Sequence, residues 1–344
     1  MKALVIHAAK DLRIEELPFT APDSGQVDVA IKAGGICGSD LHYYNHGGIG
    51  DTIRLKEPMV LGHEVAGIVA AVGSDVTGLK VGDKVAVSPS RPCGTCLYCQ
   101  KGMQSHCLNM RFYGSAMPMP HIQGAFRQRL IAEAWQCHKV SDEVSVNEAA
   151  MAEPFAVTLH GVKQAGSLLN KRVLITGCGP IGALCIIAAR VHGAREIVVT
   201  DIMDAVLNKA LEVGADRVIN TAREPEKLSA YAVNKGYFDV MFEASGNEKA
   251  LRSGIDALAP CSTLVQLGMG GDVSIPQNAL VSKEISYKGS FRFHEEFGLA
   301  VDLINKKRVN LKPLLTGIYS LDQAAEAFRV AGDRNQSMKV QISF

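Results

Sequence analysis

The stretch RVLITGCGPIG at residues 172–182 constrains the fold of this chain more than any other segment. Its apolar run leads into three glycines, Gly177, Gly179 and Gly182, and Pro180 and Ile181 open the segment that follows. The first glycine of such a pattern permits a tight turn, the second lets the backbone approach a pyrophosphate, and the third allows close packing of helix on strand. We therefore predict a strand, a turn and a helix that bind a dinucleotide through these five residues.

Short apolar runs alternate with helix-length segments around this turn. The runs EIVVTD, DRVIN, FDVMFEASG and STLVQLG are typical of buried strands, whereas PIGALCIIAARVHG, DAVLNKALEVG and EKALRSGIDALA are typical of helices. Strands that alternate with helices favour a parallel, doubly wound sheet. We expect an α/β fold with a dinucleotide-binding Rossmann sheet in residues 149–287.

The chain on either side of this region has a different texture. Up to about residue 135, runs such as VDVAIKA and EVAGIVAAV are separated by glycine and proline, which predicts a β-rich, partly barrel-like region. After about residue 288 the pattern reverts, with helices predicted in FGLAVDLINKK and LDQAAEAFRVAG and a final strand in MKVQISF. We expect residues 1–148 and 288–344 to form one domain, into which residues 149–287 are inserted.

Asp201 predicts which dinucleotide binds. It ends the run EIVVTD, where a carboxylate accepts hydrogen bonds from the adenosine ribose and repels a 2′-phosphate. No arginine follows Asp201 closely in the sequence to receive that phosphate, although a lysine such as Lys209 is near enough to reach it. We expect NAD to be favoured over NADP.

Four cysteines lie in RPCGTCLYCQKGMQSHC at residues 91–107, in the pattern C-x2-C-x2-C-x7-C. The N-terminal apolar run ends at His7 and lacks a signal-peptide core, so we expect a cytoplasmic, reducing location in which cysteines stay free. Four thiolates around one ion form a closed tetrahedral site, which is typical of structural zinc. The predicted ligands are Cys93, Cys96, Cys99 and Cys107.

The charge balance disfavours two classes of partner. The 344 residues include 36 basic and 35 acidic side chains, so no excess of positive charge attracts nucleic acid or an anionic membrane. No window is apolar over the thickness of a bilayer. We expect a small-molecule substrate.

Two glycine-flanked segments offer ligands for a second metal with an open position. GGICGSDLHYY contains Cys37, and VLGHEVAG contains His63 and Glu64. Each has an ordinary alternative, because Cys37 would also serve as a small buried residue and His63 as a hydrogen-bonded core histidine. A third segment, MAEPFAVTLHG, places Glu153 at the start of the link to the nucleotide-binding region.

The order of GGICGSDLH, GHEVAG, the four-cysteine segment, AEPFAV and ITGCGPIG resembles the zinc-dependent medium-chain alcohol and polyol dehydrogenases over essentially the whole chain. The resemblance implies a GroES-like catalytic domain beside the Rossmann domain, and a catalytic zinc held by Cys37, His63 and a carboxylate. Glu64 matches the ligand of sorbitol-type enzymes, and Glu153 matches a second glutamate near their metal. A cysteine that alcohol dehydrogenases outside this branch place there is missing, which points to the polyol branch and leaves both glutamates open as the direct ligand.

The resemblance also implies how a proton leaves the site. Zinc is a redox-inert Lewis acid that acidifies a substrate hydroxyl, so that hydride can pass to the nicotinamide. Ser39 and His42 match the positions from which the family conducts the proton to solvent, against the alternatives of a helix-capping hydroxyl and a surface histidine. The expected catalytic residues are Ser39, His42 and Glu153.

Longer stretches such as MRFYGSAM and KEISYKGSFRF resemble members of the polyol branch that oxidise a secondary hydroxyl of a sugar acid, reversibly. A sugar acid needs a cation for its carboxylate, and Arg292 matches a position where sorbitol-type enzymes place an arginine facing the substrate. Arg111, beside the aromatic Phe112, is a second candidate, and both arginines have the alternative of a structural or solvated role. Tyr43 either offers its hydroxyl to the substrate or packs in the core.

Two rival functions stay open at this point. One is a dehydrogenase of the same branch that acts on sorbitol, xylitol or L-threonine, and an uncharged polyol would gain nothing from a carboxylate-binding arginine. The other is a non-catalytic NAD- and zinc-binding protein, which would have no need of the ligand set Cys37, His63 and Glu64. The resemblance further implies a homodimer or homotetramer.

Overall fold

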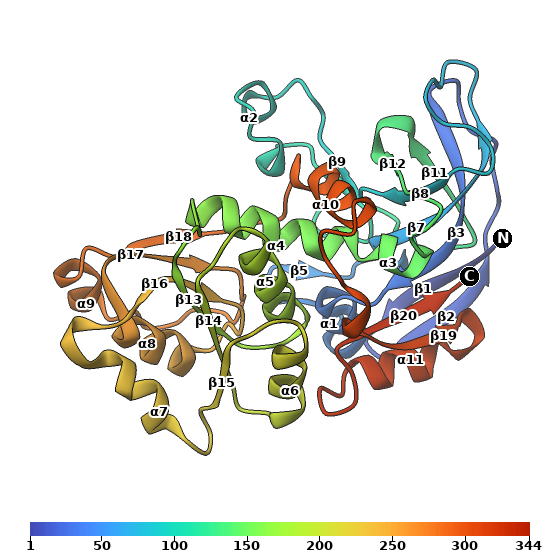
Figure 1. The fold of residues 1–344 in the computed structure, drawn as a ribbon. Helices are drawn as coiled ribbons and strands as arrows, with labels where there is room; N and C mark the ends of the chain where they lie inside the picture. Colours follow the sequence, from blue (N-terminus) through green and yellow to red (C-terminus); the bar gives the residue numbers. More distant parts are fainter.

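The computed structural model describes all 344 residues, and its central part contains a six-stranded sheet in which every pairing is parallel (Figure 1). From edge to edge its strands are β15 (Arg217–Asn220), β14 (Glu196–Asp201), β13 (Arg172–Thr176), β16 (Phe238–Glu243), β17 (Leu258–Gln266) and β18 (Ser286–Gly289). The winding reverses between β13 and β16, which is where such sheets bind ligands. The expected doubly wound sheet is confirmed.

Helices cover both faces of this sheet. Successive strand residues point to opposite faces, so Val173 packs against one layer of helices and Leu174 against the other. The first layer consists of α4 (Ala152–Ala165), α5 (Pro180–Val191) and α6 (Asp204–Glu212). The second consists of α7 (Pro225–Ser229), α8 (Glu248–Ala257) and α9 (Gln277–Ser282).

The rest of the chain is built around a seven-stranded, mostly antiparallel sheet. Its strands run in the order β12 (Cys137–Lys139), β8 (Lys84–Val87), β7 (Glu64–Val72), β3 (Gln26–Gly35), β20 (Lys339–Ser343) and β19 (Leu315–Ser320), and β11 (Arg129–Glu133) also pairs with β3. Small sheets surround it, formed by β1 (Lys2–Ala8), β2 (Asp11–Glu16) and β6 (Met59–Val60), by β4 (Gly48–Ile49) and β5 (Ile53–Arg54), and by β9 (Ser90–Arg91) and β10 (Arg111–Phe112). The β-rich region expected from the sequence is confirmed.

The last strand, β20, lies beside a strand from the start of the chain. It pairs antiparallel with β3 and parallel with β19. This pairing supports the division into 1–148 with 288–344 and 149–287, which we keep as a proposal. The short strand β18, which is mostly exposed, spans residues 286–289 and so crosses the proposed boundary at 287/288.

Five further α-helices complete the fold. They are α1 (Gly38–His46), α2 (Leu97–Gln100), α3 (Val146–Ala150), α10 (Glu296–Asn305) and α11 (Ala324–Ala331). Figure 1 shows α4 between the two sheets, and buried residues of α4, α10 and the parallel sheet belong to one continuous core. None of the helices has the length and apolar character needed to cross a membrane.

Candidate active site

Cys37, His63 and Glu64 come together where α1 meets the start of β7. Cys37 is the N-cap of α1, His63 precedes β7, and Glu64 is its first residue. One ligand atom from each, a sulfur, an imidazole nitrogen and a carboxylate oxygen, lies within 4.8 Å of the other two. His63 and Glu64 are buried, and Cys37 is partly exposed.

This set of donors fits a zinc ion. Nδ1 of the buried His63 has no hydrogen-bond partner in the protein. Buried nitrogen atoms nearly always have a partner, so an unpaired one indicates that the site binds a ligand. Thiolate, imidazole and carboxylate are the groups that bind zinc, and three protein ligands leave a fourth position free. Burial alone would lower the pKa of His63, but Asp40 and Cys37 raise it well above its ordinary value.

Asp40 ties together the two segments that carry Cys37 and His63. Its fully buried carboxylate accepts hydrogen bonds from the backbone N–H of Cys37 at 2.9 Å and of Gly62 at 3.1 Å. The same carboxylate lies 4.0 Å from Nδ1 of His63. The sequence predicts no role for Asp40, although its place three residues after Cys37 is a capping signal that points back to the N-cap backbone.

Glu64 has a buried partner that sequence reasoning missed. Nζ of Lys339, from β20, donates to both of its carboxylate oxygens and also to the carbonyl oxygen of Ile36. The one local signal for this ion pair is that the strand KVQIS, which is mostly buried, begins with a lysine. Its partner, 275 residues away, cannot be found from that pattern.

Glu153 lies in the first turn of α4, outside the group formed by Cys37, His63 and Glu64. Its side chain is buried, and burial raises its pKa to about 7 in spite of the opposing effect of His63. The negative charge of Glu64 adds to the increase. A carboxyl group with such a pKa exchanges protons readily near neutral pH.

Arg292 stacks between two aromatic rings beside this group. Its Cζ atom lies 4.3 Å from the ring centroid of Phe112 and 4.9 Å from that of Phe291. The Phe112 ring in turn lies 5.6 Å from that of His63, centroid to centroid. Arg292 donates to the sulfur of Met117 at 3.4 Å and forms no salt bridge, so its charge is free to bind an anion.

A cavity of about 520 Å³ opens beside Arg292. Phe291 and Met117 line it together with residues of the four-cysteine segment, including His106. The rings of His106 and Phe291 are stacked with their centroids 6.3 Å apart. The four-cysteine segment therefore forms part of the wall around Arg292.

Arg111 lies elsewhere. Arg111 and Phe112 are successive residues of β10, so their side chains point in opposite directions. Phe112 faces His63, whereas Arg111 lines a separate cavity of about 290 Å³ together with Arg127 and Arg129. The structure thus brings Arg292, and not Arg111, to the metal-binding group.

Helix α1 carries the other predicted residues on two faces. Ser39 and His42 are three residues apart and share a face, on which Ser39 is half-buried and His42 is exposed. Tyr43 points into the core, where its hydroxyl accepts a hydrogen bond from the backbone N–H of Ala116 at 3.0 Å. Burial raises the pKa of Tyr43, so its hydroxyl keeps its proton.

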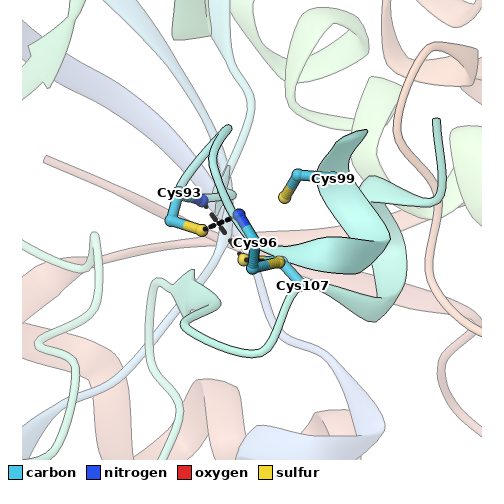
Figure 2. Close-up of side chains that lie close together, drawn as sticks. All are labelled: Cys93, Cys96, Cys99 and Cys107. Carbon is cyan, nitrogen blue, oxygen red and sulfur yellow. Dashed lines mark hydrogen bonds between the residues drawn. The ribbon is translucent and has the colours of Figure 1, made fainter. Parts of the chain in front are cut away.

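The four cysteines of residues 93–107 converge on one point, as Figure 2 shows. Their ligand atoms lie within 4.8 Å of one another, and no disulfide joins them: Cys93, Cys96, Cys99 and Cys107. The sulfur of Cys107 accepts hydrogen bonds from the backbone N–H of Cys93 at 3.2 Å and of Asn109 at 3.3 Å. Backbone N–H groups that point at sulfur stabilise thiolates.

The acidity of these thiols differs with their surroundings. Hydrogen bonds from the backbone of Thr95 and Cys96 lower the pKa of Cys93 to about 5. Burial raises the pKa of Cys99 to about 12. Four sulfur atoms at this separation fit a closed tetrahedral zinc site, in which the metal ionises all four thiols.

The glycine turn after β13 has the geometry expected of a dinucleotide site. Gly177 has φ 84°, and a side chain there would collide with Ser245. A Cβ atom at Gly182 would lie 1.9 Å from the carbonyl oxygen of Gly177. A Cβ atom at Gly179, the N-cap of α5, would meet no protein atom, so this backbone faces open space. Helix α5 begins there with Pro180 and then Ile181.

Asp201 stands at the end of β14 beside this turn. One of its carboxylate oxygens accepts hydrogen bonds from the backbone N–H of Cys178 at 2.8 Å and from the guanidinium of Arg334 at 2.7 Å. The sequence places no arginine close after Asp201, but the structure brings Arg334 to it from 133 residues away. Lys209, which the sequence places near enough to reach a 2′-phosphate, is paired with Glu212.

Two family models match this chain. The model described as "Alcohol dehydrogenase GroES-like domain" matches residues 23–142, and the model described as "Zinc-binding dehydrogenase" matches residues 180–306.

Curated proteins and solved structures of the same kind resemble the whole chain. It is 41% identical to L-idonate 5-dehydrogenase (NAD(P)(+)) of Escherichia coli (strain K12), over 100% of this chain and 98% of that protein. It is 36% identical to sorbitol dehydrogenase of Bos taurus, over 99% of this chain and 95% of that protein. The crystal structure of L-idonate 5-dehydrogenase from Escherichia coli superimposes with a TM-score of 0.96 at 40% identity, over 100% of this chain and 98% of that one.

Proposed function

This chain belongs to the zinc-binding dehydrogenases that carry an alcohol dehydrogenase GroES-like domain, and from that premise we propose that it oxidises a secondary hydroxyl of a sugar acid. It is an enzyme of the medium-chain type that uses zinc and a nicotinamide dinucleotide. The proposed reaction converts L-idonate to 5-keto-D-gluconate and is reversible. A relative that is 41% identical is named for the same substrate, which supports this choice.

The observation that carries the substrate class is the unpaired guanidinium of Arg292. It lies beside the metal-binding group, is held between Phe112 and Phe291, and forms no salt bridge. Its backbone φ of 56° is unusual for a residue other than glycine, and such strain persists where the surroundings enforce it. A planar guanidinium binds a carboxylate through two parallel hydrogen bonds, whereas a neutral polyol offers it no charge.

We propose that Cys37, His63 and Glu64 hold the catalytic zinc. When bound, the zinc supplies a Lewis acid that makes a substrate hydroxyl more acidic. Glu64 is the better candidate for the direct carboxylate ligand, because Glu153 lies outside the group of three donors. Asp40 keeps the backbone on both sides of the site in place, and the charge of Lys339 balances that of Glu64.

The protein residues also provide a route for the proton. We propose that Ser39, in the half-buried part of α1, accepts this proton while its hydroxyl donates its own proton onward. His42, exposed to solvent one turn along the same face, then passes a proton to solvent. Glu153 holds or exchanges a second proton at its buried carboxyl group. Tyr43, whose hydroxyl already accepts from Ala116, still has its own proton to donate to a substrate oxygen.

The geometry of the glycine turn supports a dinucleotide site. We propose that the pyrophosphate lies against the open backbone of Gly179 and the first turn of α5, where free N–H groups and the helix dipole favour an anion. The adenosine ribose then lies at Asp201. The four-cysteine segment is proposed to hold a second, structural zinc.

Assembly and location are further proposals. Strand β18 is one edge of the parallel sheet, and an edge strand offers unpaired backbone groups to another chain, which supports a homodimer or homotetramer. The predicted thiolate sites need reduced cysteines, which supports a cytoplasmic location.

A neutral polyol is the second candidate substrate, and the 36% identity to bovine sorbitol dehydrogenase supports it. Reduction of NAD and NADP by the purified, zinc-loaded protein should therefore be measured with L-idonate, D-gluconate, sorbitol, xylitol and L-threonine. Turnover confined to L-idonate is the expected result. Turnover of sorbitol or xylitol alone would contradict the sugar-acid proposal, and absence of turnover with all five would contradict the catalytic proposal.

A further inference from the structure

Arg334 and Asp201 form an ion pair between distant parts of the chain. Arg334 lies in the loop between α11 and β20, whereas Asp201 ends β14 of the parallel sheet. The guanidinium donates to Oδ2 of Asp201 at 2.7 Å. Asp201 is buried, but the side chain of Arg334 keeps 45% of its exposure and is free to rotate away.

The carboxylate of Asp201 has no spare acceptor site while this pair is formed. Its Oδ2 accepts from Cys178 and Arg334, and its Oδ1 accepts from the backbone N–H of Ile202 and Met203. A carboxylate offers about four lone-pair positions. An adenosine ribose that donates its hydroxyls to Asp201 must therefore displace Arg334, since the other three donors belong to the backbone.

Arg334 also lines a cavity of about 560 Å³. Its wall includes the cations Lys10 and Arg334, and Asp333 is its only carboxylate residue. A third cation of the wall, Arg329, is paired with Glu326. Met203, two residues after Asp201, also lines it, so the cavity reaches the end of β14. A hollow in which positive groups outnumber negative ones attracts anions.

We propose that Arg334 and this cavity form a subsite for a dinucleotide 2′-phosphate, which makes Arg334 the residue that sets the choice between NADP and NAD. The inference rests on the dinucleotide site of the proposed function. A 2′-phosphate beside Asp201 would be repelled by the carboxylate alone. Arg334 removes that obstacle, because it can turn from Asp201 to the phosphate and bind two of its oxygens.

Other cations near Asp201 already have partners. Lys209 is paired with Glu212, and Arg223 is paired with Asp204 at the start of α6. Arg334 is therefore the cation that both touches Asp201 and lines the cavity.

The test compares two ligands that differ only in the 2′-phosphate. Binding of adenosine 2′,5′-bisphosphate and of 5′-AMP is measured by calorimetry with the zinc-loaded protein, its Arg334→Ala variant and its Arg334→Lys variant. Arg334→Ala should weaken binding of the bisphosphate about tenfold or more, because a charge-assisted contact is lost, and change that of 5′-AMP less than about threefold. Arg334→Lys should keep part of the selectivity, since the charge remains.

Arg190→Ala is the matched control. Arg190, in α5, also donates from Nη2 to an aspartate at 2.7 Å, Asp216 just before β15, but it does not line the cavity. This variant should bind both ligands as the unmodified protein does. Equal changes for both ligands in Arg334→Ala, or no change for either, would overturn the subsite and leave the dinucleotide site intact. Failure of the unmodified protein to bind either ligand would overturn the dinucleotide site and the subsite together.

Discussion

Nζ of Lys339 lies 2.8 Å from each carboxylate oxygen of Glu64, and both side chains are almost completely buried. Removing one partner of a buried ion pair leaves an uncompensated charge and costs about 3–5 kcal/mol. Lys339→Met should therefore lower the free energy of unfolding by about 3 kcal/mol in zinc-free protein. The loss should be smaller in zinc-loaded protein, because a metal held by Glu64 supplies positive charge.

Urea unfolding with and without a chelator measures both values. Lys306→Met is the matched control, because Lys306 is exposed and its pair with Asp302 contributes less than about 1 kcal/mol. A loss for Lys339→Met that does not depend on zinc would contradict the assignment of Glu64 as a ligand.

Asp40→Asn tests a positioning residue. The two carboxylate oxygens of Asp40 accept from the backbone N–H of Cys37 and of Gly62, one bond each. In asparagine an NH2 group replaces one of these oxygens, so one of the two hydrogen bonds is lost. Loss of such an outer partner typically costs about 10–100-fold in metal affinity. Competition with a chelator should show this loss at one zinc per chain, with the second zinc unaffected. Unchanged affinity at both sites would show that Asp40 serves the fold alone.

Cys37→Ser and Cys93→Ser test the division between the two metal sites. Each variant should lose one zinc per chain by elemental analysis. Cys37→Ser should keep its folding stability. Its turnover should fall about 100-fold or more, because the metal stabilises the transition state of the reaction by several kcal/mol. Cys93→Ser should unfold at a lower temperature, while its folded fraction still turns over. The exposed Cys261, changed to serine, serves as the control. Equal effects of Cys37→Ser and Cys93→Ser on stability and turnover would refute the division.

Glu296 links α10 to α4 in a pH-dependent way. Burial alone would raise its pKa, but hydrogen bonds from His160 and from the backbone N–H of His294 lower it to about 2, from an ordinary value of 4.5. A lowered carboxyl pKa adds stability above the unfolded value, and that stability is lost as the pH falls toward 2. Glu296→Gln should therefore be less stable by about 2 kcal/mol at pH 7, with a difference that shrinks below pH 4.5.

Urea midpoints between pH 3 and pH 7 would show this trend. Glu295→Gln, at the exposed neighbouring residue, should show little difference at any pH. A stability difference for Glu296→Gln that grows as the pH falls would have the wrong sign for this account.

The sequence predicts the fold well where its signals are local. The glycine turn at residues 177–182, the strand and helix alternation after it and the four closely spaced cysteines each lie within a short segment, and the fold they indicate is confirmed. Strands β18 and β19 were not predicted, because SYKG and LTGIYS are partly exposed and lack an apolar run.

The residues that sequence reasoning missed act across long distances. Lys339 contacts Glu64 and Arg334 contacts Asp201 in a fold in which β20 pairs with β3. No spacing rule connects residues 275 or 133 positions apart. Arg111 was predicted to lie at the site but does not. Its neighbour Phe112 reaches His63, and because successive side chains of a strand point in opposite directions, Arg111 points away. Its direction depends on a two-residue strand that the sequence does not signal.

The central claim is that Arg292 selects a carboxylate-bearing substrate. L-Idonate and L-iditol differ only in a carboxylate in place of a hydroxymethyl group, so kcat/KM should be measured for both with the unmodified enzyme and with Arg292→Met. We predict a preference for L-idonate that falls about 100-fold in the variant, while turnover of L-iditol changes less than about threefold. A preference of the unmodified enzyme for L-iditol, or an equal fall for both substrates, would contradict the account.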